Sequence, residues 1–396
     1  MVDRYYQKGR PIHFVGSGNQ TRLVDPTVES VALCNEICAP IERVAADAIR
    51  VTTGWRWLDL LHYLQSEGLT FPVFTSNLNA TIGGTLATGG VGLLSHRSGL
   101  QVDHVLACTI HSAAGKFTLH PCAEPLWQSA LCSLGGVGFV SSVILKVEQP
   151  EAVFILDEAH IARSDAFQLF MDCINNPQPE TAFVICRVDR RSAAVRIGST
   201  SQASKRGQTW TRSLTTPETL ALSSTSEVSG HTRRLWNDFI LSIPEAPRFF
   251  EATMTALAIA EREVGISARV RALSLAAPPS GTDRPFLHPL SRFTSASVGI
   301  GFYLDVDPTA TGALATALEL QQRLKGGCIA RGGAPYAAGT LKFSAADCPL
   351  FYGQGWDQFS ATRTLHDPLS LFGTALAFPF RNGELNRPDL DGSPAS

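Results

Sequence analysis

The segment TIGGTLATGG, residues 81–90, places four glycines and three threonines within ten residues and carries no charge. Because glycine has no Cβ, its backbone can approach a ligand closely and can adopt positive φ. Such a run also leaves N–H groups and small hydroxyls facing whatever lies against it, as in sites that hold phosphates and flat rings. Taken alone, the run is equally compatible with a glycine-rich loop that has no chemical role.

Three further segments accompany this run. Residues 16–20 (GSGNQ) form a second glycine turn directly after the apolar, strand-like residues 12–15. Residues 54–61 (GWRWLDLL) begin a helix, because leucines recur there at helical spacing. A third glycine cluster, GGVGFV, occupies residues 135–140. The first turn lacks the third glycine of the Rossmann dinucleotide fingerprint, so a nicotinamide-binding half is not expected.

Taken in order, these segments resemble the FAD-binding domain of the PCMH-type flavoproteins, the family of vanillyl-alcohol oxidase and p-cresol methylhydroxylase. That family reads approximately R-G-x-G-H-S, G-x-x-w-x-d-L, T-V-G-G-x-l-a and L-F-w-A-x-x-G-G-x-G, and matching pieces follow in the same order within residues 1–148. Residues 332–336 (GGAPY) resemble its G-G-x-x-Y, and residues 356–372 resemble its closing segment. The pattern is most similar to cytokinin dehydrogenases and decaprenylphosphoryl-ribose oxidases.

The resemblance implies an α+β fold with two domains, and the length of 396 residues agrees with two or three. Residues 1–148 would form the FAD-binding domain. Residues 149–333 would form an inserted substrate domain with an antiparallel sheet flanked by helices. Residues 334–396 would return to the FAD domain. In the family a helix and a strand usually precede the first glycine turn, so the start of this chain is expected to be either trimmed or abbreviated.

Local patterns add expectations for individual elements. Apolar runs bounded by turns predict strands at residues 49–53, 105–111, 117–120, 137–147, 183–188 and 298–306. Helices are predicted at residues 124–134 and 313–324, and Ser164 with Asp165 is read as a helix N-cap. Residues 199–230, rich in Ser and Thr, are expected to form a surface loop, with a cap over a site as the alternative.

Composition argues against several classes of protein. Charged residues make up only 17% of the chain and the net charge is −2, so the basic surplus of a nucleic-acid binder is missing. No run approaches the ~18 apolar residues of a membrane span, and the first residues lack a signal-peptide core. We therefore expect a cytoplasmic location without membrane contact. The nine cysteines include no C-x-x-C pair, so reduced thiols and no metal site are expected.

The chain departs from the family where its members attach the cofactor or place a base. Asn19 stands where G-H-S has the linking histidine, and Asn79 stands where other members have a linking cysteine. The resemblance therefore implies FAD held without a covalent bond. The base positions of the two similar enzyme groups are also altered, and they hold Ser76, Gly339 and Val91 here. Their activities are accordingly not carried over.

The resemblance and the remaining polar residues give a set of candidate site residues. The cofactor-binding candidates are Gly16, Ser17, Gly18, Asn19, Gln20, Thr75, Ser76, Thr81, Gly83, Gly84, Thr85, Ala87, Gly138, Phe139 and Val140. Tyr336, His96 and Lys342 are the acid–base candidates, and a phenol near a flavin can exchange a proton. The substrate-binding candidates are Asn77, Arg97, Tyr303, Asp305 and Arg331. The competing interpretations are a core aromatic for Tyr336, a solvated turn for His96 and Arg97, and surface salt bridges for Lys342 and Arg331.

These inferences predict an FAD-dependent oxidoreductase that takes a hydride from a C–H bond next to oxygen or nitrogen in a small molecule. The cofactor would perform the difficult chemistry while the protein orients the substrate and handles protons. Oxygen or another acceptor would reoxidise the flavin, and a role in natural-product metabolism is an extension of this hypothesis. Two alternatives stay open, namely a redox-neutral flavoprotein such as a cyclase or isomerase, and a binding protein that has lost its flavin.

Overall fold

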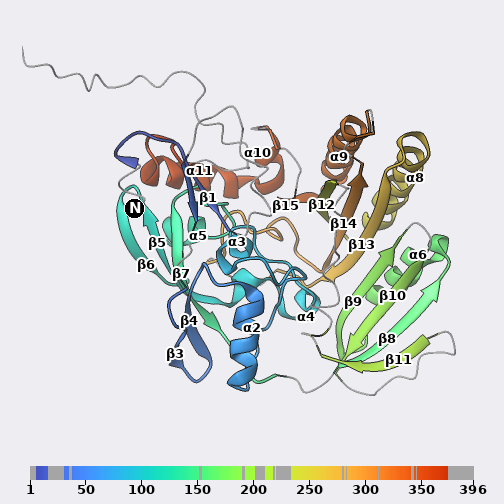
Figure 1. The fold of residues 1–396 in the computed structure, drawn as a ribbon, viewed down its shortest axis with the longest axis horizontal. Coiled ribbons are helices and arrows are strands. Elements are labelled where there is room, and N and C mark those ends of the chain that lie inside the picture. Colours follow the sequence, from blue (N-terminus) through green and yellow to red (C-terminus); the bar gives the residue numbers. More distant parts are fainter. Residues whose placement is uncertain are drawn as a thin grey trace, which may run out of the picture.

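The computed structural model describes most of the chain. The described residues are 6–16, 31–34, 38–150, 154–189, 192–200, 210–216, 219, 233–278, 281, 283–307, 309–310, 312–339, 343–344 and 346–372. They form two lobes, each built around a β-sheet, with a C-terminal segment lying across both (Figure 1).

The first lobe contains a five-stranded antiparallel sheet in the order β3-β4-β7-β5-β6 and a separate parallel pair, β1-β2. Its buried core centres on Trp57, Phe71 and Phe74, whose rings contact one another. The strands are β1 (Ile12–Val15), β2 (Val31–Cys34), β3 (Glu42–Ala45), β4 (Ala48–Thr52), β5 (Val105–Ser112), β6 (Gly115–Leu119) and β7 (Phe139–Lys146). The helices are α2 (Trp57–Ser66), α3 (Ile82–Leu86), α4 (Ser95–Ser98), the 3-10 turn η2 (Gln101–His104) and α5 (Pro125–Ala130).

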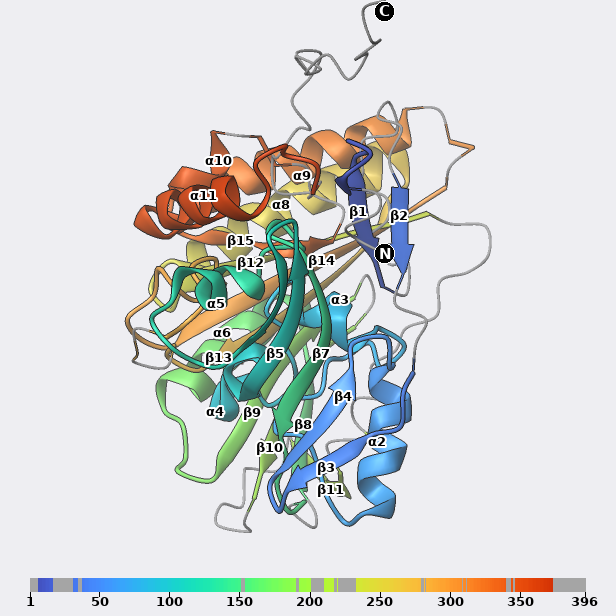
Figure 2. The same ribbon diagram turned by 90° about the vertical axis from the view of Figure 1, so that its left-hand side faces the viewer.

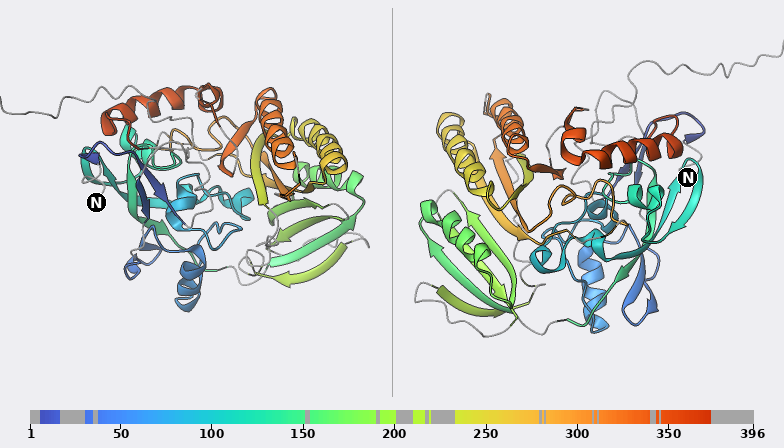
Figure 3. Two further views of the ribbon diagram at one scale, coloured as in Figure 1. Left: turned by 45° about the horizontal axis from the view of Figure 1, so that its top comes forward. Right: turned by 180° about the vertical axis from the view of Figure 1, so that it is seen from behind.

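The second lobe is an eight-stranded sheet in the order β11-β8-β10-β9-β13-β14-β12-β15, in which every neighbouring pair is antiparallel. Three helices cover one of its faces (Figures 1 and 3). The strands are β8 (Phe154–Ile161), β9 (Thr181–Val188), β10 (Ala193–Ser199), β11 (Trp210–Thr215), β12 (Arg233–Ser242), β13 (Ser267–Leu275), β14 (Ser297–Val306) and β15 (Ala334–Gly339). The helices are α6 (Arg163–Asn175), α8 (Ala246–Val264) and α9 (Ala313–Ile329).

Alternation of side chains separates the two faces of this sheet. On β12, Leu235, Phe239 and Leu241 pack into the core shared with the helices. Trp236 lies on the opposite face, where it packs against the core of the first lobe together with Leu273 of β13. We call this opposite face the inner face. It is turned toward the first lobe, as the views in Figure 3 show.

The C-terminal segment touches both lobes. β15 is the edge strand of the large sheet, beside β12. α10 (Asp347–Tyr352) and α11 (Gln354–His366) follow it, and α11 packs against α5 of the first lobe (Figure 2). The chain then reaches β1, where the N–H of Ile12 donates to the carbonyl of Leu371 at 2.7 Å. Residues between β13 and β14 also return to the first lobe, and Leu287 and Leu290 are buried in its core.

Most predicted elements occur, with three differences. The helix predicted at 124–134 ends at Ala130, because Cys132 and Leu134 adopt positive φ, which a helix cannot include. The residue that caps α6 is Ala162 and not Ser164. Residues 199–230 were predicted as a surface loop, but their described part includes strand β11, because residues 210–215 pair with β8 at the edge of the large sheet.

The described helices contain no stretch that is both long enough and apolar enough to cross a lipid bilayer.

Phe239 tests the packing between the large sheet and its helices. Its side chain is fully buried, with ring centroids 5.5 Å from Phe249 of α8 and 5.7 Å from Phe302 of β14. Phe239→Ala should lower the free energy of unfolding by about 3–5 kcal/mol, because it removes a large buried side chain and leaves a cavity. Urea unfolding of both proteins measures this difference.

Leu214→Ala on β11 is the matched control, because that side chain is 71% exposed. Its effect should stay within about 0.5 kcal/mol. A Phe239→Ala loss as small as that of the control would contradict this packing.

Candidate functional site

Two of the glycine segments meet at the surface of the first lobe. A Cβ added to Gly16, just after β1, would overlap the hydroxyl of Thr81 and lie 3.5 Å from the Cα of Gly84. A Cβ added to Gly84 would lie 3.0 Å from the same hydroxyl and 4.0 Å from the Cα of Gly16. Gly84 is exposed and Gly16 is half-buried. Two stretches of bare backbone therefore face each other where a ligand can reach them.

Residues of the short helix α3 and its cap differ in what they contact. The Thr81 hydroxyl caps the helix by accepting from the N–H of Gly84 at 3.2 Å. The N–H of Gly83 donates to the carbonyl of Thr53 at 2.9 Å, and its missing Cβ lets Thr53 pack closely. The Thr85 hydroxyl accepts from the indole of Trp57 at 2.7 Å. Gly83 and Thr85 thus fasten the helix to the lobe, and Gly84 is left on the open side.

The third glycine segment locks onto the end of α3. The N–H groups of Cys132 and Leu134 donate to the carbonyls of Leu86 and Ala87, at 3.1 and 3.0 Å. These contacts hold both donors at positive φ, 60° and 52°, which non-glycine residues adopt at a cost. Strain of this kind persists only where the surrounding structure requires it. The two hydrogen bonds therefore hold this turn against the end of the glycine run.

The turn also brings the start of β7 to the same place. The ring of Phe14, on β1, occupies the space that a Cβ on Gly135 would need. Phe14 also contacts Phe139, with ring centroids 5.2 Å apart. Gly138, at φ 144°, passes against the backbone of His111. The carbonyl of Val140 accepts from the Thr53 hydroxyl at 2.7 Å. The three glycine segments, distant in sequence, are therefore packed together around α3 and the end of β1.

The predicted residues just before the glycine run form a compact turn. The Thr75 hydroxyl accepts from the N–H of Asn77 at 3.4 Å, and the Asn77 side chain accepts from the N–H of Asn79 at 3.2 Å. Ser76 and Asn79 are exposed. Ser17, Gly18, Asn19, Gln20 and Lys342 were also predicted, and they lie outside the described residues.

Tyr336 connects the C-terminal segment to the glycine run. Its buried hydroxyl accepts from the N–H groups of Gly90 and Val91, at 3.1 and 3.3 Å, and lies 3.1 Å from the Thr88 hydroxyl. Thr88 donates its own proton to the carbonyl of Thr85 at 3.0 Å, so the phenol proton is directed to Thr88. Burial raises the pKa of Tyr336 to about 12, which keeps the phenol neutral near pH 7.

The inner face of the large sheet carries a polar cluster next to this connection. Trp236 and Asp238 of β12 pair with Tyr303 and Gly301 of β14, and the rings of Trp236 and Tyr303 stack with centroids 6.4 Å apart. The guanidinium of Arg271, on β13, lies 5.2 Å from the centroid of the Tyr303 ring. Burial raises the pKa of Tyr303 to about 12. Tyr303, predicted to bind substrate, thus lies on the strand face that is turned toward the first lobe, and substrate binding by it stays a prediction.

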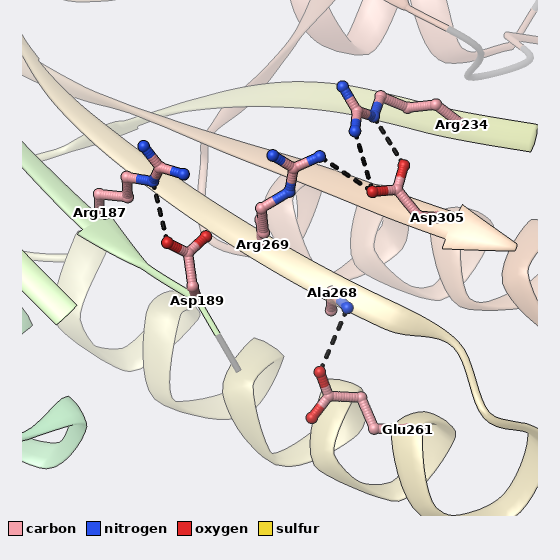
Figure 4. Close-up of polar contacts among 7 residues, drawn as sticks. All are labelled: Arg187, Asp189, Arg234, Glu261, Ala268, Arg269 and Asp305. Atoms are coloured by element: carbon pink, nitrogen blue, oxygen red, sulfur yellow. Dashed lines mark hydrogen bonds and ion pairs between the residues drawn. The ribbon is translucent and has the colours of Figure 1, made fainter. Parts of the chain in front are cut away.

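Asp305, a further substrate-binding prediction, is engaged by two arginines (Figure 4). Arg234 binds both of its oxygens, at 2.7 and 2.9 Å, and Arg269 donates to one of them at 2.9 Å. Arg331, at the end of α9, donates to the carbonyl of Gly327 at 3.0 Å. These contacts give both residues a structural task, and substrate binding by either stays a prediction.

His96 and Arg97 lie in α4, which packs against β9 and β13 of the large sheet. His96 is half-buried, its Nδ1 has no partner among the described residues, and burial lowers its pKa. Arg97 is exposed, and its guanidinium lies 5.9 Å from the ring of Phe154. The helix therefore belongs to the boundary between the lobes, and an acid–base role for His96 stays a prediction.

The surface formed by the glycine segments fits the cofactor that the sequence motifs imply. The missing Cβ atoms let Gly16 and Gly84 lie against each other and against the Thr81 hydroxyl, and they leave bare backbone at the exposed Gly84, which is what close approach of a phosphate to backbone needs. Trp236, Asp238 and Arg271 of the inner face were not among the predicted residues. The strand pattern RRLWNDFILS at 233–242, with polar or aromatic residues at alternate positions, is the signal that could have identified the first two.

Residues 1–119 match the family model described as an FAD binding domain. An uncharacterised oxidoreductase of the fasciation locus of Rhodococcoides fascians is 33% identical over 102 residues, which are 26% of this chain and 23% of that protein. Cytokinin dehydrogenase 10 of Oryza sativa subsp. japonica is 31% identical over 109 residues, or 26% of this chain and 20% of that protein. Cytokinin dehydrogenase 3 of Arabidopsis thaliana is 30% identical over 104 residues, or 25% and 20%.

These matches confirm the recognition made from the glycine segments, and they identify FAD as the cofactor. The aligned segments span about a fifth of the length of each of these relatives. The family-model match lies in the first lobe, so the substrate is left to be inferred from the second lobe.

Gly84 tests the position of the cofactor. Gly84→Asp should abolish FAD binding, because it would crowd the Thr81 hydroxyl, place a carboxylate on the exposed backbone next to Gly16 and repel the cofactor phosphates. The variant should fold, with lower stability, and should purify without the yellow colour of bound flavin. The absorbance of the flavin relative to that of the protein measures occupancy.

Gly326→Asp in α9 is the matched control, because Gly326 is exposed and a Cβ there would meet nothing within 4 Å. It should retain full flavin occupancy. Undiminished flavin absorbance in Gly84→Asp would refute the assigned position.

Proposed function

We propose that this chain is an FAD-dependent oxidoreductase that oxidises a C–H bond next to oxygen or nitrogen in a small molecule. The observation that carries the proposal is the packing of three glycine segments against one another, with Gly84 exposed, within a lobe that matches an FAD binding domain. When bound, FAD supplies the acceptor for a hydride. The oxidoreductase and cytokinin dehydrogenase names of the similar proteins support this class of reaction.

In this proposal the glycine segments hold the cofactor. The exposed backbone of Gly84 and the half-buried Gly16 would contact its phosphates. The turn at Cys132 and Leu134, hydrogen-bonded to the carbonyls at the end of α3, would fix the position of Gly138 relative to the cofactor. The inner face of the large sheet, with Trp236 and Tyr303, would receive the substrate. The electron acceptor would be oxygen or another oxidant, and a place in natural-product metabolism is part of the same proposal.

Tyr336 would act by positioning. Its proton is directed to Thr88 and its oxygen already accepts from two backbone N–H groups, so the phenol is fully hydrogen-bonded. The neutral phenol therefore holds the backbone of Gly90 and Val91 against β15. This contact would set the distance between the cofactor-binding surface and the substrate-binding face.

The cofactor would be bound without a covalent link. Asn79, at one of the two attachment positions of the family, is exposed in a turn, and its carboxamide is not a nucleophile. Asn19, at the other position, lies outside the described residues.

The purified protein should be yellow, and acid or heat should release intact FAD into solution. The reason is that asparagine stands at both attachment positions. Filtration of the denatured protein, followed by chromatography of the filtrate, separates free from attached flavin. Flavin that stays with the denatured polypeptide would contradict non-covalent binding, and colourless protein that takes up no added FAD would contradict the proposed function itself.

Tyr336→Phe keeps the ring and removes the hydroxyl that holds Gly90 and Val91. We expect the rate at which a substrate reduces the flavin to fall at least about tenfold, because the two surfaces that hold cofactor and substrate are then misplaced, while FAD binding persists. Anaerobic stopped-flow bleaching with a panel of alcohols and amines measures this rate. The same panel separates net oxidation from a redox-neutral reaction, which would leave the flavin yellow.

Tyr63→Phe in α2 is the control for removal of a tyrosine hydroxyl elsewhere, and its rate should equal that of the unmodified protein. An unchanged rate in Tyr336→Phe would reduce Tyr336 to a packing residue.

A further inference from the structure

The inner face holds a carboxyl group, Asp238, that belongs neither to the cofactor-binding surface nor to the ion pairs of Asp305 with Arg234 and Arg269. Asp238 lies on β12 directly opposite Gly301 of β14. A Cβ on Gly301 would overlap Oδ1 of Asp238, so the absence of a side chain there is what makes room for the carboxyl group. Asp305, the other carboxylate on this face of the two strands, is instead bound by Arg234 and Arg269.

A break in strand pairing places Asp238 beside Tyr336. Asn237 pairs with Gly339 and Phe239 pairs with Pro335, so three residues of β15, 336–338, bulge opposite Asp238. Bulges of this kind are frequent next to active sites, where they redirect a side chain. Because the Tyr336 hydroxyl contacts Gly90 and Val91, the bulge brings Asp238 to the boundary with the cofactor-binding lobe.

The groups that face Asp238 come from three neighbouring strands. Arg271 of β13 is the cation whose charge acts on it, and Tyr303 of β14 and Tyr336 of β15 are two neutral phenols close enough to sense its charge. Arg269 also acts on Tyr303 but is bound to Asp305. A cation, Arg271, and two proton-bearing phenols therefore surround Asp238, and Trp236 lies two residues away on the same face of β12.

We propose that Asp238 is the proton acceptor of the reaction, and that the substrate is an alcohol or an amine whose O–H or N–H group meets this carboxylate. The proposal rests on the proposed function. The substrate C–H bond breaks with its electron pair, which leaves as hydride to FAD. The O–H or N–H bond breaks and its proton goes to Asp238, while its electron pair forms the C=O or C=N bond. The substrate loses two electrons and FAD gains two.

The environment suits Asp238 to this task. Burial raises its pKa to about 6, and the charge of Arg271 opposes that rise. A base works best when its pKa lies near the working pH, because it is then ionised and still holds a proton well. The rate of flavin reduction should therefore increase with pH through about 6 and level off above it. A raised pKa also means that ionisation destabilises the fold, so wild-type stability should fall relative to Asp238→Asn as pH rises from about 4 to about 7.

Sulfite tests the position of the carboxylate without any substrate, because this small anion adds reversibly to the oxidised flavin ring. In Asp238→Asn, the Kd for sulfite at pH 8 should be at least about tenfold lower than in the unmodified holoenzyme, because a nearby negative charge is removed. At pH 5 the two proteins should bind sulfite equally, since Asp238 is then protonated. Because the variant and the unmodified protein are compared at the same pH, the ionisation of sulfite itself affects both Kd values equally.

Two further variants sharpen this test. Asp189→Asn removes a carboxylate from the end of the same sheet, where it pairs with Arg187 at 3.0 Å, and should leave sulfite binding unchanged at both pH values (Figure 4). Gly301→Ala keeps every charge but forces the Asp238 carboxyl group to move. Its Kd for sulfite at pH 8 should therefore differ from that of the unmodified protein, because the distance between the carboxylate and the flavin ring changes.

Where the panel supplies a substrate, this substrate should reduce the flavin of Asp238→Asn about 10² to 10⁴ times more slowly than that of the unmodified protein, and the pH dependence near 6 should disappear. Asp238→Glu should restore part of the rate. Equal sulfite affinity of Asp238→Asn and the unmodified protein at pH 8 would overturn the proposal, as would an undiminished rate of reduction. Either result, in a protein that binds FAD, leaves the proposed function standing. Failure to bind FAD or to be reduced by any substrate would instead overturn the proposed function.

Discussion

The contact that the rest of the site depends on is the pair of backbone N–H groups, from Gly90 and Val91, that point at one phenol oxygen. That oxygen belongs to Tyr336, on the edge strand of the other lobe. Each donor would lose a hydrogen bond if the lobes moved apart, and at the buried Gly90 an unpaired N–H group is costly. The contact therefore fixes how the cofactor-binding surface faces the large sheet.

The two faces of the large sheet have different neighbours, the helices on one side and the first lobe on the other. Alternate residues of β12 and β14, such as Phe239 and Phe302, are buried under the helices. The residues between them, including Trp236 and Asp238, face the first lobe. Ordinary strand alternation thus supplies a rigid polar surface at no cost to the core. The ion pairs of Asp305 neutralise part of the positive charge on this surface and leave Asp238 as the carboxyl group nearest the bulge.

The sequence could predict the parts of this account that are local. Glycine spacing identified the cofactor-binding lobe, and apolar runs located β4, β5, β7, β9 and β14. Long-range partners were beyond reach, because the bond between Tyr336 and Gly90 joins positions 246 residues apart. Asp238 was missed for the same reason, since its place depends on the register of β12 against two neighbours. The positive φ values of Cys132 and Leu134 were also hidden, because nothing in their side chains favours them.

A crystal structure of the protein with FAD tests the central claim most directly. The account predicts that the phosphates lie against the backbone of Gly16 and Gly84, and that the flavin ring lies between the glycine run and the inner face that carries Trp236 and Asp238. A flavin ring turned away from that face, or phosphates bound elsewhere, would contradict the account.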